Sequence, residues 1–444
     1  MLDLVKKYNV PTPRYTSYPT VPYWENNLNE ENWKAKIKKA FKAFNNDGIS
    51  IYIHLPFCES LCTYCACNTR ITVNHTVETK YIQALIKEWK LYLIEFDAKP
   101  LIRELHLGGG TPTFFSPDNL KYLISSILAE AEIAEEFDFS FEGHPDNTTI
   151  SHLQTLFNLG FKRLSLGIQD FDMNVQTAIN RFQDFETVEK LIQNARKIGY
   201  TSINLDIIYG LPFQTEMSIL DTFSKIKLLM PDRIAFYSYA HVPWLKPGQR
   251  KYSEQDLPAD EVKKKLFKVG MEVLNEAGYK DIGFDHFALP NDALYIASEN
   301  RTLHRNFMGY TTNKTKMLVG LGCSSISDMW DAFGQNLKTV EEYQDTINAG
   351  KFAISKGHIL NSEDLDIRQH ILNLMCLQQT SIDSYFYEAE ERLAELFEDQ
   401  LIEVIDDKLL VNNTGKHFLR NICLAYDFRY WQKVPQKATF SSSS

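Results

Sequence analysis

The chain has 444 residues, of which 44% are apolar and 23% charged, a composition typical of folded globular proteins with more than one domain. Its net charge of −10 argues against nucleic acid as the main partner, because phosphate backbones are bound by basic surfaces. We find no apolar stretch long enough to span a membrane and no signal-peptide core in the first ten residues, so we expect a cytoplasmic protein.

Residues 1–48 are expected to form an N-terminal arm and a helix. The segment PTPRYTSYPT (11–20) contains three prolines, which exclude a helix or a central strand. Residues 30–46 have the periodicity of an amphipathic helix, and Asn29 could cap its first turn.

From residue 49 onward, short apolar runs alternate with longer segments of helical periodicity. The runs cover residues 49–55, 102–107, 137–142, 162–169, 201–210 and 233–240. This alternation predicts an α/β fold in which helices cover a parallel sheet. Every run ends in polar or glycine-rich residues, which would meet at one mouth of a barrel. We therefore favour a partial, TIM-like (βα)6 barrel over an open sheet, with residues 278–288 and 317–327 as additional elements.

The barrel and its extension are expected to occupy residues 49–330. Residues 331–444 have mostly helical periodicity, apart from a hairpin at 401–411 that turns at Asp406-Asp407. Helices with one hairpin suggest a mostly helical, winged-helix-like C-terminal domain. Because this segment is not basic, we expect it to act as a lid or a packing domain rather than to bind DNA.

Four of the seven cysteines are crowded into ten residues: Cys58, Cys62, Cys65 and Cys67. An odd number in a chain of this length does not suggest a disulfide framework. The first three have the spacing CxxxCxxC, and three thiolates on one loop can hold three irons of a [4Fe–4S] cluster while the fourth iron stays open to a small molecule. A zinc loop or a group of buried free thiols is the alternative, although structural zinc sites usually pair two such loops.

The motifs around these cysteines resemble those of radical S-adenosylmethionine enzymes. The cysteine loop follows the first strand and has Tyr64 before its last ligand, and GGGTP (108–112) follows the second strand, where glycines would allow close approach to a cofactor. Over nearly the full length, the chain is similar to oxygen-independent coproporphyrinogen III oxidases. The segments that carry this resemblance are 13–20, 52–68, 169–181, 204–215, 239–241, 285–290, 303–312 and 420–427.

The resemblance implies a role for each matching residue. Cys58, Cys62 and Cys65 would ligate the [4Fe–4S] cluster, and Tyr52 and Cys67 would be catalytic residues beside it. The residues implied to contact cluster-bound S-adenosylmethionine are Tyr52, Gly109, Glu142 and Ile326. The residues implied to line a second S-adenosylmethionine site are Tyr64, Gly110, Thr111, Gln169, Arg181, Asp206 and Ala240. The sequence departs from the family at Gly143-His144-Pro145, where an arginine is missing and His144 is expected to be an ordinary loop residue.

The implied activity is an oxidoreductase reaction of haem biosynthesis, the conversion of coproporphyrinogen III to protoporphyrinogen IX. A 5′-deoxyadenosyl radical would start the oxidative decarboxylation of two propionates to vinyl groups. Arg14, His304 and Arg305 are candidates to hold propionates, and a surface salt bridge is the alternative for each. The resemblance also implies an electron donor such as flavodoxin or ferredoxin and an unknown electron acceptor, and we expect a monomer. A haem-binding chaperone or a haem-modifying enzyme of the same superfamily is the alternative function.

Overall fold

The computed structural model describes residues 2–435 and 440. It contains two compact units, which we call the barrel unit and the terminal unit. The barrel unit comprises Asn26–Gly278 and Thr315–Ile359, and the terminal unit comprises Met1–Glu25, Tyr279–Lys314 and Leu360–Ser444. The division into domains at residues 48 and 330 stays a prediction about the sequence. Within the described residues, no helix has the length and apolar character needed to cross a membrane.

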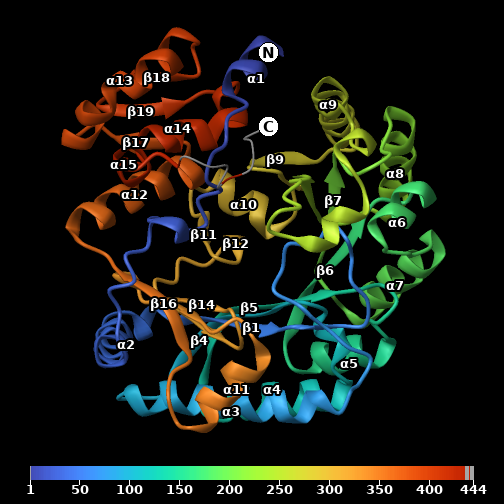
Figure 1. The fold of residues 1–444 in the computed structure, drawn as a ribbon, viewed down its shortest axis with the longest axis vertical. Helices are drawn as coiled ribbons and strands as arrows, with labels where there is room; N and C mark the ends of the chain where they lie inside the picture. The colour runs from blue at the N-terminus through green and yellow to red at the C-terminus, as the bar shows by residue number, and fades with distance from the viewer. Residues whose placement is uncertain (1, 436–439, 441–444) are drawn as a thin grey trace. The chain divides into compact units, whose positions relative to one another are not determined.

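The barrel unit is built on parallel strands that follow one another in chain order. They are β1 (Ile49–Leu55), β4 (Leu101–Gly109), β5 (Glu132–Gly143), β6 (Phe161–Gln169), β7 (Ser202–Tyr209) and β8 (Arg233–Ser238). Each strand is hydrogen-bonded to the next, and all of these pairs are parallel. This order confirms the predicted α/β fold with a partial (βα)6 barrel (Figure 1).

Most helices of the barrel unit connect these strands, and Figure 1 shows α3, α4, α5, α7 and α8 outside the sheet. The helices are α2 (Glu30–Phe44), α3 (Val77–Glu95), α4 (Pro117–Leu128), α5 (Ile150–Asn158), α6 (Met173–Ile179), α7 (Phe185–Ile198), α8 (Glu216–Leu229), α9 (Asp260–Glu276) and α11 (Val340–Asn348). Their ends follow local sequence signals. The Asn29 side chain caps α2 by accepting from the Asn32 N–H at 2.8 Å, as predicted. Gly199 ends α7 with a φ of 118°, a conformation that glycine adopts without strain.

The sheet continues on the other side of β1 with shorter strands. They are β13 (Leu318–Leu321), which is parallel to β1, and the antiparallel strands β14 (Ile326–Asp328), β15 (Ala332–Asn336) and β16 (Ile354–Ile359). The expectation of mostly helical structure from residue 331 is therefore wrong for β15 and β16. Strands of five or six residues carry too little periodicity to be distinguished from helix, and here pairing within a buried sheet decides the conformation.

The terminal unit combines helices with short antiparallel strands. Its helices are α1 (Leu2–Tyr8), α10 (Ala293–Glu299), α12 (Ser362–Leu377), α13 (Ser384–Glu398), α14 (Leu419–Ala425) and α15 (Phe428–Gln432). Its strands are β9 (Lys280–Gly283), β10 (His286–Ala288), β11 (His304–Asn306), β12 (Gly309–Thr311), β17 (Gln379–Ser381), β18 (Ile402–Ile405) and β19 (Lys408–Val411). The predicted hairpin is present as β18 and β19, with Asp406 and Asp407 at φ values of 48° and 56°. This is the left-handed turn that joins two strands most tightly.

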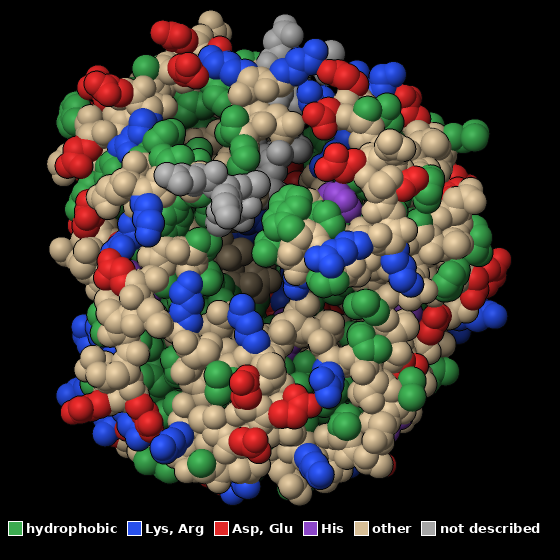
Figure 2. All heavy atoms as spheres, viewed as in Figure 1, with side chains coloured by type: hydrophobic (Ala, Val, Ile, Leu, Met, Phe, Trp, Pro, Cys, Tyr) green, Lys and Arg blue, Asp and Glu red, His purple; other side chains and the backbone are tan. Residues whose placement is uncertain are grey.

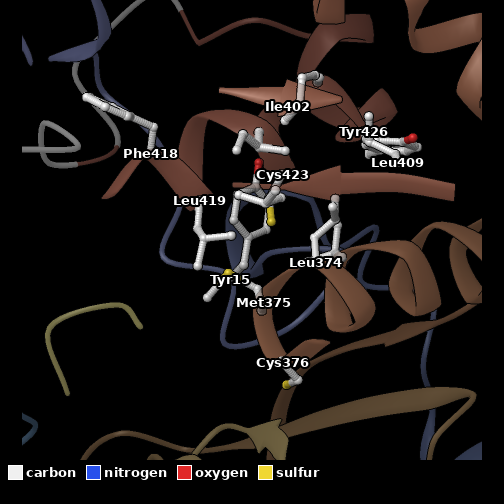
Figure 3. Close-up of a cluster of buried hydrophobic side chains, with 14 of the residues drawn as sticks. Tyr15, Leu374, Met375, Cys376, Ile402, Leu409, Phe418, Leu419, Cys423 and Tyr426 are labelled. Carbon is white, nitrogen blue, oxygen red and sulfur yellow. The ribbon is translucent and has the colours of Figure 1, made fainter. Parts of the chain in front are cut away.

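The core of the terminal unit lies between its helices and the three-stranded sheet of β17, β19 and β18. Figure 3 shows Cys376 of α12 and Cys423 of α14 among the apolar side chains of this core, which include Leu374 and Leu409. Both thiols are buried and belong to the packing of the unit.

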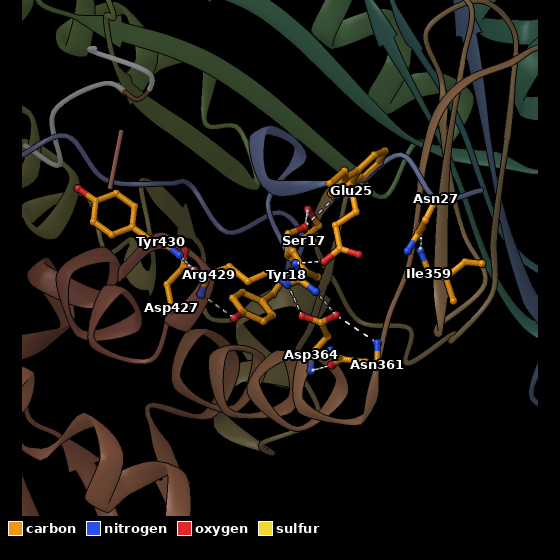
Figure 4. Close-up of polar contacts among 12 residues, drawn as sticks. Ser17, Tyr18, Glu25, Asn27, Ile359, Asn361, Asp364, Asp427, Arg429 and Tyr430 are labelled. Atoms are coloured by element: carbon orange, nitrogen blue, oxygen red, sulfur yellow. Dashed lines mark hydrogen bonds and ion pairs between the residues drawn. The ribbon is translucent and has the colours of Figure 1, made fainter. Parts of the chain in front are cut away.

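The terminal unit also contains an ion pair between the partly exposed Arg429 and the buried Asp364 (Figure 4). Arg429 Nε and Nη2 donate to the two Asp364 oxygens at 2.5 and 2.8 Å, and the Asp364 side chain is only 2% exposed. Because Asp364→Ala leaves the guanidinium without this acceptor, we expect a loss of about 3 kcal/mol in the free energy of unfolding. Glu25, which is 53% exposed, also pairs with Arg429, and Glu25→Ala should cost less than about 1 kcal/mol. Denaturant unfolding of both variants measures the difference, and equal losses would contradict the expectation.

Candidate active site

The four clustered cysteines lie on a loop that follows β1 in the barrel unit. Two short strands, β2 (Phe57–Cys58) and β3 (Arg70–Ile71), pair in parallel and close the base of this loop. The C-terminal end of α6 fixes its middle: Thr63 donates through N to Ile179 O at 2.9 Å and through Oγ1 to Ala178 O at 3.0 Å. Asn180 Nδ2 also donates to Leu61 O at 2.8 Å. Hydrogen bonds with the end of α6 therefore hold the loop in place.

The glycine segment after β4 is joined directly to the cysteine loop. The register pairs Leu55 with Gly109, so β1 and β4 end together. Gly110 N donates to Leu55 O at 2.9 Å, and Thr111 Oγ1 donates to Cys58 Sγ at 3.4 Å. A Cβ atom on Gly110 would lie 2.6 Å from the carbonyl carbon of Pro56, so only glycine allows this approach.

Glu142 at the end of β5 lies next to the glycine segment. It accepts a hydrogen bond from the Gly109 N–H at 3.2 Å, and His106 Nε2 lies 3.4 Å from its other oxygen. Loss of water around the carboxylate acts to raise its pKa, but His106 and the Gly109 N–H outweigh this effect and lower the pKa of Glu142. Glu142 is therefore ionised at neutral pH and suits a cationic ligand such as an ammonium group.

Arg181 and Gln169 form a second polar part of the site. Arg181 donates through Nη1 to Cys62 Sγ at 3.7 Å and through Nη2 to Gly167 O. Arg181 Nε and Gln169 Oε1 are buried and have no hydrogen-bond partner among the described residues. Gln169 also has a positive φ of 67°, and a Cβ atom on Gly167 would lie 2.6 Å from its Nε2. Buried polar atoms normally have hydrogen-bond partners. Two such atoms without partners near the end of a strand therefore indicate that a polar ligand binds here.

Asp206 on β7 is the acidic residue of this second part. Asn204 Nδ2 donates to Asp206 Oδ1 at 2.8 Å, and Ser165 Oγ donates to Oδ2 at 3.5 Å. Burial raises the pKa of Asp206 to about 7, and the negative charge of Glu142 adds to the rise. The carboxyl group is thus partly protonated near neutral pH.

This raised pKa predicts a pH-dependent stability difference between the protein and Asp206→Asn. The folded protein binds this proton more tightly than the unfolded chain, whose ordinary Asp pKa is 3.8. The stabilisation that this tighter proton binding gives is therefore complete below about pH 4 and is lost as the pH rises through about 7. Between pH 4 and 7, the denaturant midpoint of the unaltered protein should therefore fall relative to the midpoint of Asp206→Asn. A difference that does not change with pH would contradict the assignment.

The thiols differ in their surroundings although they share one loop. Burial raises the pKa of Cys58 to about 11, while a hydrogen bond with the Cys67 thiol lowers the pKa of Cys65 to about 6. Cys58, Cys62 and Cys65 are partly buried and Cys67 is exposed. Across residues 2–435 and 440, no three His, Cys, Asp or Glu side chains lie close enough together to hold a single metal ion.

The structure also places the other predicted residues of the barrel unit. Tyr52 lies on β1 and its ring stacks on His106, with centroids 6.0 Å apart. Gln249 Nε2 donates to Tyr64 O at 3.1 Å and to Ala240 O at 3.3 Å, which links these two predicted residues. Ile326 on β14 approaches β13 so closely that a Cβ atom on Gly320 would lie 2.5 Å from its carbonyl oxygen.

Several residues that support the site were not predicted from the sequence. They are His54, His106, Ser165, Asn204 and Gln249. For two of them a signal was present, because residues two apart on a strand share a face. His54 lies two residues after Tyr52, and its Nδ1 is hydrogen-bonded to the Tyr52 hydroxyl at 3.0 Å. Asn204 lies two residues before Asp206, and its Nδ2 donates to Asp206 Oδ1. The other three, His106, Ser165 and Gln249, are far in sequence from the residues that they contact.

His144 lies in the loop after β5. Its Nδ1 accepts from the Asp146 N–H at 3.2 Å, and its carbonyl oxygen accepts from Thr148 Oγ1. Burial lowers the pKa of its imidazole to about 3. These hydrogen bonds hold the loop together.

The substrate candidates Arg14, His304 and Arg305 all belong to the terminal unit, and their role stays a prediction.

Comparison with known proteins identifies the class. The Radical SAM superfamily model matches residues 52–226, which include the cysteine loop and the glycine segment. Oxygen-independent coproporphyrinogen III oxidases from Pseudomonas aeruginosa and Escherichia coli are 37% and 35% identical to this chain. These alignments cover 96% and 98% of this chain and 95% and 96% of the relatives. The solved structure of coproporphyrinogen III oxidase (HemN) from Escherichia coli, described as a radical SAM enzyme, matches with a TM-score of 0.91 at 34% identity, over 96% of this chain and 98% of that one.

The partial barrel, with its cysteine loop joined to a glycine segment, is that of a radical SAM enzyme. Enzymes of this class use a [4Fe–4S] cluster and S-adenosylmethionine, and the site fits both, with three thiols on one loop and an ionised Glu142 beside the glycines. Within this class, the chain belongs to the family of oxygen-independent coproporphyrinogen III oxidases.

Proposed function

We propose that this chain catalyses the oxidative decarboxylation of two propionates of coproporphyrinogen III to vinyl groups, giving protoporphyrinogen IX in haem biosynthesis without oxygen. The observation that carries this proposal is the similarity over nearly the whole chain to oxidases with that name, combined with an intact cysteine loop and glycine segment. The bound cluster and S-adenosylmethionine together supply a carbon-centred radical that removes a hydrogen atom from the substrate.

In this proposal, the cysteine loop holds the cluster. Cys58, Cys62 and Cys65 ligate three irons, and Cys67 lies beside them and is hydrogen-bonded to Cys65. The contacts from Thr111 to Cys58 and from Arg181 to Cys62 place hydrogen-bond donors on two ligand sulfurs. Donors to thiolate sulfur favour its negative charge and raise the reduction potential of a cluster.

The remaining predicted residues position the cofactor. Glu142 accepts from the ammonium group of S-adenosylmethionine, and Gly109, Tyr52 and Ile326 line its place. The second site is lined by Tyr64, Gly110, Thr111, Gln169, Arg181, Asp206 and Ala240. There Arg181 offers its unpaired Nε–H to a carboxylate, and Asp206 accepts from a hydroxyl or an ammonium group.

Three further parts of the proposal concern the protein's surroundings. An electron donor such as flavodoxin or ferredoxin would supply the electron for the cluster, and a separate acceptor would take the electron left on the substrate. The protein acts as a cytoplasmic monomer. Size-exclusion chromatography with light scattering measures its oligomeric state.

Anaerobic turnover tests the function. The reconstituted protein is incubated with coproporphyrinogen III, S-adenosylmethionine and a reductant, and the oxidised products are separated by chromatography. We expect protoporphyrin to appear with release of two molecules of CO₂ for each product. A haem-binding chaperone would instead bind haem stoichiometrically and form no vinyl product, and that result would overturn the proposal.

A further inference from the structure

Arg305 on β11 of the terminal unit is a buried cation with unused hydrogen-bond donors. The residue is 5% exposed, and its guanidinium lies between two aromatic rings, with Cζ 4.8 Å from the Phe284 centroid and 4.6 Å from the Tyr310 centroid. Its Nε and Nη1 are buried and have no hydrogen-bond partner among the described residues. The rings attract the charge but offer no acceptor in the plane of the guanidinium.

Other arginines of the same unit have acceptors. The buried Arg420 donates through Nε to Pro13 O at 3.2 Å and through Nη2 to Thr12 O. Arg429, which is partly exposed, holds the carboxylate of Asp364 through Nε and Nη2. Buried charges in folded proteins are nearly always paired and hydrogen-bonded, because taking them out of water is costly. Arg305 departs from this rule, which indicates that a ligand supplies its acceptor.

The surroundings of Arg305 favour an anionic ligand. The guanidinium groups of Arg14, Arg420 and Arg305 and the carboxyl group of Asp281 all act on Asp285, while burial raises the pKa of Asp285. Three basic side chains thus face two acidic ones in this part of a chain whose net charge is −10. On the face shown in Figure 2, acidic and basic side chains are interspersed, so an anionic ligand depends on a local cationic group.

We propose that Arg305 anchors a carboxylate-binding site in the terminal unit and that this site holds a propionate of the substrate. The proposal rests on the proposed function, in which the substrate carries four carboxylates and keeps two of them. Arg305 donates through Nε and Nη1, and Phe284 and Tyr310 hold the guanidinium in place. His304 precedes Arg305 on β11 and so faces the opposite side of the strand, which excludes it from this site.

The test compares two arginine variants of the reconstituted holoenzyme, Arg305→Met and Arg392→Met. Arg392 is a matched control in the same unit, because its Cζ lies 4.4 Å from the Phe428 ring and its Nη2 donates to Glu388 O at 3.0 Å. Fluorescence titration measures the Kd for coproporphyrin III, the oxidised tetracarboxylate, and for its uncharged tetramethyl ester. Anaerobic assays give the KM for coproporphyrinogen III.

We expect Arg305→Met to raise the Kd for coproporphyrin III and the KM on the order of 10- to 100-fold, because two charge-assisted hydrogen bonds are lost. Binding of the ester and the behaviour of Arg392→Met should not change. The Tm of Arg305→Met should not fall. Nε and Nη1 of Arg305 donate to no protein atom, so their removal leaves no protein acceptor without a hydrogen bond.

An unchanged Kd in Arg305→Met would overturn the proposal, and so would equal losses in both variants. A lower Tm with unchanged Kd would make Arg305 a structural residue and would also overturn it. If the unaltered protein forms no vinyl product yet binds coproporphyrin III through Arg305, the proposed function fails while the carboxylate site stands. If the unaltered protein forms the vinyl product but Arg305→Met has an unchanged KM, the carboxylate site fails while the proposed function stands.

Discussion

Cys62→Ser is expected to abolish formation of the vinyl product and to remove the EPR signal of the reduced cluster. A serine hydroxyl stays protonated at neutral pH and is a poor ligand for the iron of a [4Fe–4S] cluster, which is bound by thiolates. Only two of the proposed ligands then remain on the loop. The change also removes the sulfur that Arg181 contacts at 3.7 Å. Iron and sulfide content, measured with the EPR spectrum after anaerobic reconstitution, should fall together with activity.

Cys376→Ser provides the matched control for this experiment. Cys376 lies on α12 in the core of the terminal unit, so its replacement places a hydroxyl in an apolar core and lowers stability. Its iron content and EPR spectrum should nevertheless equal those of the unaltered protein. A normal EPR signal in Cys62→Ser would contradict the ligand assignment, even if activity were lost.

Gly110→Ala is expected to lower turnover by about 100-fold or more, although it changes no polar group. The new Cβ would lie 2.6 Å from both the carbonyl carbon and the oxygen of Pro56, and backbone atoms in a strand-end connection cannot rotate away. The hydrogen bonds from Gly110 N to Leu55 O and from Thr111 N to Phe57 O would lengthen as the two segments separate. A displacement of about 1 Å in a catalytic site can cost about 100-fold in rate. Overpacking should also lower the free energy of unfolding by about 1–3 kcal/mol.

Gly248→Ala separates this local effect from a general intolerance of alanine. Gly248 lies near the same loop, but a Cβ atom there would be 3.3 Å from the nearest atom, Thr63 O, and a shift of a few tenths of an ångström accommodates it. We expect nearly normal turnover. Turnover that falls equally in both variants, or a Gly110→Ala protein with normal activity, would show that close approach at Gly110 is not required.

The barrel could be predicted from the sequence because its strands and helices differ in length and in periodicity. Six apolar runs separated by long helical segments leave few ways to build a parallel sheet. The strands β15 and β16 could not be predicted in the same way. Their residues become strand through pairing with neighbours in the sheet, and β15 ends only a few residues before helix α11 begins.

The centre of the site was predictable from spacing, whereas its supporting residues were not. The cysteine loop and the glycine segment are each continuous in sequence, so their chemistry can be read directly. His106, Ser165 and Gln249 act through contacts with residues 36 to 185 positions away. Such contacts depend on strand register and loop path, which a single sequence does not reveal.

Several of the hydrogen bonds that hold the cysteine loop involve no sulfur atom. Thr63 is bound to the end of α6, Leu61 O accepts from Asn180, and Tyr64 O accepts from Gln249. In small zinc domains, by contrast, metal binding is what folds the chain. Exposure to oxygen that destroys the cluster should therefore leave a folded polypeptide with an empty but shaped loop. Such a polypeptide is expected to take up iron and sulfide again under anaerobic conditions without having to refold.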